Sequence, residues 1–442
     1  MGATSNLRHR SRAYAAFVSG ARHQHHVVRW LGVAALTLLL VGCSIPVVAP
    51  SPAPSSGRDV ASGSSQLGQA RATINALLNA TRTGDRLGFE GLISDRDPTF
   101  PDRARLLYAN LSTLPLTRLQ ARVEPTQVKL AGARAQLLGS GAWAQRAVVS
   151  WRLAGDDADV EHQVWLTFLS DDGQVRLAGT VDQPPDTIPE QKPSWWLGPV
   201  TAQERRGVTV VVGSGQAPDR WAKLAATALD NVHRHLPDGL GLSWSGQVVL
   251  EVPATHRDFE SVLGEPTGSY GSIAAVTRRV GTADGATRIV INPEAAQLPS
   301  RALQAVLEHE MVHVATRSPD SPAPIWAEEG LAEWVSTQAH PGQPAEATDA
   351  VLTRVRARGA PRSFPSDRQF RVGEQDLQLA YAEAWLACRY IADRYSETQL
   401  GRLYAELDRG RSLDEASRSA LKISDAELIS SWRADLARLS QE

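Results

Sequence analysis

The sequence predicts an α+β fold made of two modules behind a targeting segment. In the stretch Ala70–Ile188, helical patterns come first and a run of strand patterns follows, which is an order typical of α+β modules. A second block, Gly198–Glu442, mixes strands and helices in its first half and is helical in its second half. With 442 residues and 42% hydrophobic residues, the chain is long enough for two or three domains with sizeable cores.

The first 42 residues, Met1–Gly42, have the features of a signal peptide. The region up to Arg29 is basic and contains no acidic residue, and the apolar run Trp30–Val41 follows it. The run ends in Leu-Val-Gly-Cys, which resembles the lipobox of bacterial lipoproteins, where cleavage precedes the cysteine and the thiol is lipidated. The resemblance implies a lipid anchor at Cys43 on the extracytoplasmic face of the cell membrane. A single-span anchor with a chance cysteine is the alternative, although the apolar run is short for a membrane span.

The stretch after the lipobox, residues 43–69, is rich in Pro, Ser and Gly, which predicts a flexible tether. The chain has only two cysteines, so Cys388 has no disulfide partner once Cys43 is lipidated. Because Cys388 lies in an apolar helical pattern, we expect it to fill the core and not to act as a nucleophile. The net charge of −2 does not favour binding to nucleic acid.

The upstream module, 70–188, shows three helical patterns followed by five strand patterns. This order resembles the nuclear-transport-factor-like cone, a curved sheet lined by helices. Pro-rich residues and Trp195-Trp196 follow it, so residues 189–197 are predicted to form the joint to a unit that folds separately, 198–442. The helical patterns are Ala70–Gly84, Leu87–Ile93 and Arg103–Leu114, and the strand patterns are Gln127–Leu130, Ala135–Leu138, Arg146–Leu153, His162–Leu169 and Val175–Val181.

The downstream block contains buried-type strand patterns around one strongly amphipathic helix pattern, Asp219–His235. A helical half follows the segment Leu303–Val335, which contains most of the candidate site residues. The strand patterns are Val208–Val212, Val248–Val252, Ile273–Val276 and Arg288–Asn292, and the helical patterns of the second half are Glu346–Gly359, Leu379–Tyr395, Ser412–Arg418 and Asp425–Leu439.

That segment, Leu303–Val335, contains the motif H-E-x-x-H at His309–His313. The Pro-Ser pair before it predicts a helix with Ser300 as its N-cap. Residues four apart lie on one face of a helix, so His309 and His313 can bind one metal ion together. Glu310 is offset from that face by one position, which suits a general base acting on a water molecule beside the metal.

A catalytic zinc needs a third protein ligand and keeps its fourth position for water. Fifteen residues separate His313 from Glu329, enough to end one helix, turn through a Pro-rich loop and begin another. Glu329 is therefore the predicted third ligand. Glu333 shares its helical face and is placed to accept a hydrogen bond from a liganding imidazole. Glu328 is turned roughly 100° away, so substitution there is expected to change little.

The motif H-E-x-x-H followed by W-x-E-E-G-x-A-E-W resembles the gluzincin zinc peptidases, most closely the peptidase MA-like group. This resemblance covers Leu303–Val335 and implies a mixed sheet, one zinc ion and Glu329 as the third ligand. It also implies that the sheet edge at Gly271–Val276 holds the main chain of the substrate. Related gluzincins place a Tyr or His oxyanion donor at or near this point of the chain, so the resemblance implies that Tyr381, at the start of the helix Leu379–Tyr395, has this role. Tyr381 also fits the core stripe of that helix.

The resulting hypothesis is a membrane-anchored zinc metalloendopeptidase that takes peptides or proteins as substrates. The alternative is a lipid-anchored binding module with a structural or vestigial metal site. Counting ligands separates the two, because structural zinc sites are closed by four protein ligands and catalytic sites are not.

Overall fold

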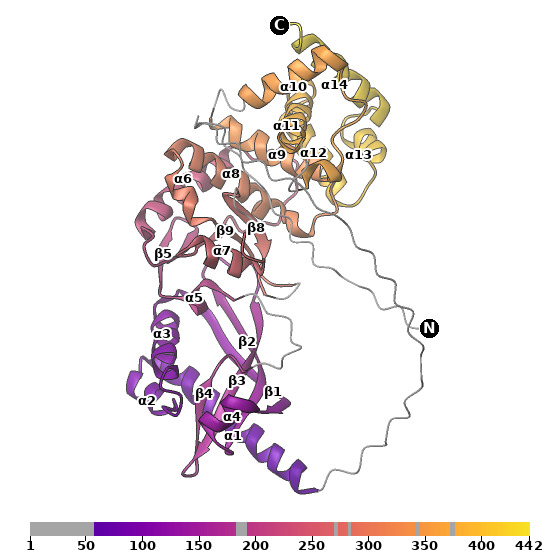
Figure 1. Cartoon of the computed structure of the whole chain (residues 1–442). Helices are drawn as coiled ribbons and strands as arrows, with labels where there is room; N and C mark the ends of the chain where they lie inside the picture. Colours follow the sequence, from indigo (N-terminus) through magenta and orange to yellow (C-terminus); the bar gives the residue numbers. More distant parts are fainter. Residues whose placement is uncertain (1–56, 183–191, 269–272, 282–283, 341–344, 372–375) are drawn as a thin grey trace, which may run out of the picture.

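The computed structural model describes residues 57–182, 192–268, 273–281, 284–340, 345–371 and 376–442. The predicted signal peptide, Cys43, the first part of the tether and Gly271 lie outside these ranges. Within them the fold is α+β, with two sheets and many helices stacked in the order of the sequence (Figure 1). None of the described helices is both long and apolar enough to cross a membrane.

The upstream module consists of helices packed on an antiparallel sheet, which has the order β1-β2-β3-β4 among the described strands. Its core joins the inner faces of α1 and α3 to the aromatic side chains of β2 and β3, such as Trp143 and Phe168. The elements are α1 (Gly57–Thr83), α2 (Arg86–Gly91), α3 (Phe100–Thr113), β1 (Leu116–Lys129), α4 (Gly132–Leu138), β2 (Ala142–Leu153), β3 (Val160–Asp171) and β4 (Gln174–Gly179).

Two predictions for this region are wrong. Ala135–Leu138, predicted as a strand, belongs to helix α4, because its Ala, Gln and Leu residues are good helix formers and glycines with positive φ stand at both ends. The tether also ends earlier than residue 69, since α1 begins at Gly57. No proline follows Pro54 until Pro98, so nothing breaks the helix over this stretch.

The second sheet is mixed, with the order β5-β6-β7-β9-β8 among the described strands. β6, β7 and β9 are parallel, while β5 and β8 run antiparallel at the two edges. The predicted edge therefore carries a strand, but the strand begins at Ala275 and not at Ile273. The elements are α5 (Ser194–Leu197), β5 (Val200–Arg205), β6 (Val208–Gly213), α6 (Pro218–His235), β7 (Val248–Val252), α7 (His256–Leu263), β8 (Ala275–Arg279) and β9 (Thr287–Ile291).

Both faces of this sheet are covered, which explains why its strands are almost continuously apolar. Val210 and Leu250 point into the core made with the helices of the second block. Val211 and Val249, one position along each strand, point the other way and join a cluster with residues of the upstream module. The sheet thus lies between the upstream module and the helices that carry the H-E-x-x-H motif.

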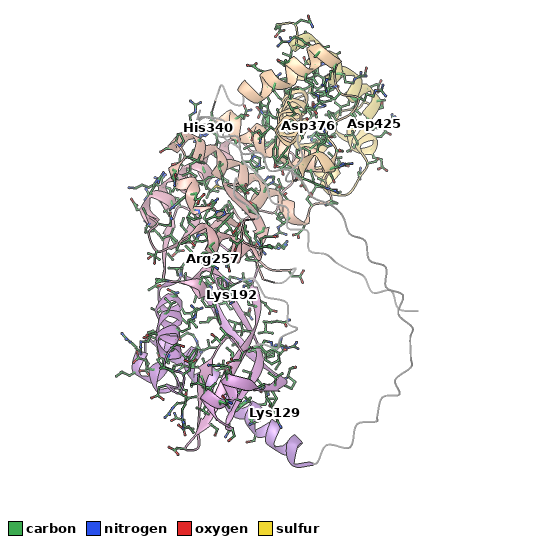
Figure 2. All side chains as sticks on the ribbon, in the orientation of Figure 1. Lys129, Lys192, Arg257, His340, Asp376 and Asp425 are labelled. Atoms are coloured by element: carbon green, nitrogen blue, oxygen red, sulfur yellow. The ribbon has the colours of Figure 1, made fainter. Side chains whose placement is uncertain are left out.

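Trp195 and Trp196, on α5, are buried in that shared cluster, as their predicted place at the joint required. Asn110 of the upstream module donates hydrogen bonds to the carbonyl oxygens of Trp195 and Gly198 at 2.7 and 2.8 Å. Figure 2 shows Lys192 and Arg257 near this junction and Lys129 far from it. The expectation that 198–442 folds separately stays a prediction.

The C-terminal half is helical, as predicted, with one further helix, α12, that the sequence patterns did not indicate. Short 3-10 turns lie at Pro293–Gln297, Ser318–Asp320 and Asp367–Phe370. The helices are α8 (Ser300–Thr316), α9 (Ile325–Gln338), α10 (Ala345–Arg358), α11 (Leu377–Arg394), α12 (Glu397–Asp408), α13 (Leu413–Ala420) and α14 (Asp425–Leu439).

Helix α8 begins differently from the prediction. Ser300 is its first helical residue, and Pro299 occupies the cap position, where no side chain accepts a hydrogen bond. The helix ends at Arg317 in a left-handed conformation with φ of 53°, whose N–H is bonded to the carbonyls of His313 and Val314. After this sharp end, the chain passes through the 3-10 turn Ser318–Asp320 and begins α9 at Ile325, and α9 packs against α8.

Gly330 allows the close packing of α9 on α11. A Cβ atom at this position would lie 2.5 Å from the Ala384 carbonyl oxygen and 2.8 Å from Cys388 Sγ. The Glu-Gly pair at 329–330 therefore combines a candidate ligand with the one residue type that fits the contact. Cys388 is buried there, which confirms that it fills the core.

Candidate metal centre

Helices α8 and α9 bring the three predicted ligands, His309, His313 and Glu329, into one cluster. Among the described residues they form a group whose potential ligand atoms all lie within 4.8 Å of one another. His309 Nε2 lies 3.1 Å from His313 Nε2 and 3.1 Å from Glu329 Oε2. His313 Nε2 lies 3.5 Å from the same Glu329 oxygen.

This triangle has the size that zinc requires. Ligand atoms placed tetrahedrally at roughly 2.0–2.1 Å from a zinc ion are about 3.3 Å from one another. All three residues are buried, with exposed fractions of 1% or less. Glu329 Oε1 makes no hydrogen bond to any described residue. Two imidazole nitrogens and a carboxylate that meet in a buried space form a donor set that can bind a divalent cation.

The electrostatics of the cluster also favour a cation. Burial alone would lower the pKa of His309, but hydrogen bonds to Glu329 and Glu333 and their negative charges outweigh it and raise that pKa to about 10. For Glu329, burial would raise the pKa, but the two imidazoles lower it below its ordinary value. The raised pKa of His309 and the lowered pKa of Glu329 both show that positive charge is favoured where the three side chains meet.

Glu310 lies beside the cluster and not in it. Its side chain is fully buried, and burial raises its pKa even though the neighbouring imidazoles oppose the shift. Oε2 accepts a hydrogen bond of 2.6 Å from the hydroxyl of Thr277 on β8. Oε1 makes no hydrogen bond to the described residues, so one carboxylate oxygen is held in place and the other is available to a water molecule.

Thr277 was not a candidate in the sequence analysis. A single threonine in a strand gives no sign of a role there, because β-branched residues are common in strands. Its hydroxyl meets Glu310 across 33 positions of sequence, and only the packing of β8 on α8 brings them together.

The other two predicted residues also lie near the ligands. Glu333 Oε2 is 3.2 Å from His309 Nδ1, the nitrogen that faces away from the other two ligands, which suits the role of holding the imidazole in place. Tyr381, half-buried in the second turn of α11, has its ring 6.5 Å from that of His309 and packs edge-on against Phe370. The structure thus leaves Tyr381 both near the site and part of an apolar contact.

Glu328 is not an exposed position at which substitution would change little. The sequence predicted that it points away from the metal, but it is 1% exposed and its charge acts on the hydroxyl of Tyr404. Helix α9 is covered on nearly all sides, so turning away from Glu329 leads into the core and not to solvent. His340, which follows α9 and is labelled in Figure 2, lies 3.0 Å from the buried carboxylate of Glu308.

Neither a family model nor a curated protein sequence matches the chain. Its structure is similar to a variant of the M1 zinc metallopeptidase from Deinococcus radiodurans, with 13% identity, a TM-score of 0.31 and coverage of 71% of this chain and 61% of the other. A two-domain M1 zinc metallopeptidase bound to L-tryptophan gives 14% identity and a TM-score of 0.30, with 66% of this chain and 61% of the other covered.

The chain thus spans about 61% of the length of these metallopeptidases. Because the TM-scores are near 0.3, any functional assignment rests on the geometry of the site itself. That geometry is a compact set of two imidazoles and two carboxylates suited to a zinc ion and a general base.

Proposed function

We propose that the protein is a zinc-dependent metalloendopeptidase of the gluzincin type. The observation that carries this proposal is the buried triangle of His309, His313 and Glu329, with edges of 3.1–3.5 Å, next to the carboxylate of Glu310. The fit of these three donors to tetrahedral zinc leaves one position open, as catalysis requires.

Each residue has a role that follows from its position. His309, His313 and Glu329 would hold the zinc ion, whose Lewis acidity would polarise the peptide carbonyl and make a nearby water molecule more acidic. Glu310 takes the proton from the attacking water and passes it to the leaving amine, for which its raised pKa is suited. Glu333 fixes the imidazole of His309. The edge of β8, which has β9 as its partner among the described strands, pairs with the substrate main chain.

The alternative is a binding module with a structural metal. It explains the triangle but gives no reason for Glu310, a buried carboxylate that interacts with the charges of both imidazoles without belonging to the ligand group. A structural site would also need a fourth protein ligand, and among the described residues the group contains three.

The proposal predicts that the purified mature chain contains one equivalent of zinc and hydrolyses internal bonds of an unfolded protein substrate. A strong chelator should abolish hydrolysis, and zinc added afterwards should restore it. Hydrolysis that continues after all metal has been removed would contradict the assignment, and a zinc protein that cleaves no peptide would favour the binding module.

Tyr381 is proposed as a hydrogen-bond donor to the oxyanion of the transition state. Removing such a donor typically lowers kcat on the order of 10²-fold. Tyr381→Phe keeps the ring contact with Phe370 and removes only the hydroxyl. We expect kcat to fall that far with the melting temperature unchanged, while Tyr390→Phe on the same helix leaves kcat alone. Equal kcat for Tyr381→Phe and wild type would assign Tyr381 to the core.

We also propose that the upstream module resembles a nuclear-transport-factor-like cone.

A further proposal is that the enzyme acts at the outer face of the membrane. This proposal rests on the lipobox-like residues ending in Cys43. A metabolically supplied fatty acid should label wild type and Cys388→Ser, which lacks the other cysteine, but not Cys43→Ser. Label retained by Cys43→Ser would refute the lipid anchor.

A further inference from the structure

The turn that joins β2 to β3 in the upstream module reaches into the second sheet. Its Asp156 accepts two hydrogen bonds from Arg288 on β9, at 2.8 and 2.6 Å, and both side chains have an exposed fraction of 0%. Arg288 also donates to Glu251 on β7 at 2.6 Å and lies 4.2 Å from the centre of the Trp151 ring. A buried guanidinium held from both modules fixes the position of β9.

The neighbouring residue, Asp157, makes a second attachment. Its carboxylate accepts a hydrogen bond of 3.0 Å from the backbone N–H of Thr287, the first residue of β9. The other oxygen lies 3.9 Å from Arg317, the residue that ends α8. On β6, Thr209 donates a hydrogen bond of 2.5 Å to the carbonyl oxygen of Ala154, which belongs to the same turn. The turn therefore contacts three separate parts of the second module.

These attachments lie one strand away from the general base. β9 pairs with β8 in a register that sets Arg288 opposite Arg278 and Ile289 opposite Thr277. Arg288 points to the upstream module, whereas Thr277 points to α8 and donates to Glu310 at 2.6 Å. β8 has β9 as its partner among the described strands, so the position of Thr277 depends on β9.

We propose that the β2–β3 turn of the upstream module, through Asp156 and Asp157, is a positioning element for Glu310. The turn fixes β9, β9 fixes β8, and β8 holds the Thr277 hydroxyl against the carboxylate of the base. The upstream module is on this account a part of the active enzyme and not only a spacer from the membrane. The inference rests on the proposed peptidase function, because it concerns the base of that reaction.

The test uses the full mature chain with Asp157→Ala, because Asp156→Asn would remove one of the two negative charges that pair with the buried Arg288 guanidinium and endanger folding. Asp159→Ala is the matched control. Asp159 lies at the end of the same turn and has nearly the same side-chain exposure, 25% against 26%, but pairs with Arg118 and Arg152 of its own module. Thr277→Val removes the hydroxyl at the other end of the chain of contacts and keeps the branched shape.

The first readout does not depend on activity. Hydrogen exchange of the amides in β8 and β9 should become faster in Asp157→Ala than in wild type, and should not change in Asp159→Ala. Unchanged exchange in Asp157→Ala would overturn the proposal, whether or not the chain proves to be a peptidase.

The second readout is kcat with the zinc content measured alongside. Asp157→Ala should lower kcat roughly threefold and Thr277→Val roughly tenfold, with zinc retained in both, as expected for the loss of one hydrogen bond that places a reacting group. In the double variant Asp157→Ala/Thr277→Val, kcat should equal that of Thr277→Val alone, because both changes break the same series of contacts between the turn and Glu310. Multiplied effects, or a fall in thermal stability with kcat unchanged, would make the turn a structural contact only. An inactive wild type would refute the peptidase proposal and leave the exchange result standing.

Discussion

His309→Ala, His313→Ala and Glu329→Ala are each expected to lose bound zinc and, with it, peptide hydrolysis. Each change removes one of the three donors of a buried triangle, and the remaining pair cannot enclose the ion. Loss of several kcal/mol of Lewis-acid stabilisation corresponds to a fall in kcat/KM on the order of 10³-fold or more, since about 1.4 kcal/mol is a factor of ten. Zinc analysis of the purified variants and a peptide hydrolysis assay measure both effects.

Glu333→Gln provides the graded comparison for this series. Glu333 contacts the far nitrogen of His309 at 3.2 Å, so its loss should weaken zinc affinity or activity roughly 10–100-fold without abolishing either. Gln338→Ala, on the exposed end of the same helix, is the control, because Glu328 is buried. If Glu329→Ala keeps its zinc while Glu328→Ala loses it, the third ligand is assigned one residue too late.

The cluster of ligands could be predicted from the sequence because its members lie on two consecutive helices. Spacings of four within a helix and a short loop between helices determine which side chains can meet, and these spacings are visible in the order of the residues. His309, His313, Glu329 and Glu333 accordingly lie together as expected.

Contacts between distant segments could not be found in this way. Thr277 meets Glu310 because β8 packs on α8, in a sheet whose strand order does not follow the sequence. Asp156 meets Arg288 across 132 positions of sequence, and no periodicity in either segment indicates it. The same holds for Glu328, whose burial depends on how α9 is covered by other helices and not on its own pattern.

The loss of the general base is the second large effect expected. Glu310→Gln keeps the size of the side chain and can still accept a hydrogen bond from Thr277, so the packing around the ligands should persist. What it cannot do is take a proton from water, and general-base catalysis by a well-placed side chain typically contributes about 10²–10⁴-fold to the rate. The variant should therefore separate metal binding from turnover.

The central measurement is the zinc content of wild type and Glu310→Gln, determined together with their rates of peptide hydrolysis. We expect equal zinc in the two proteins and a rate for Glu310→Gln lower by at least roughly 10²-fold. Equal zinc with equal rates would contradict the account, because Glu310 would then not be the general base of the reaction.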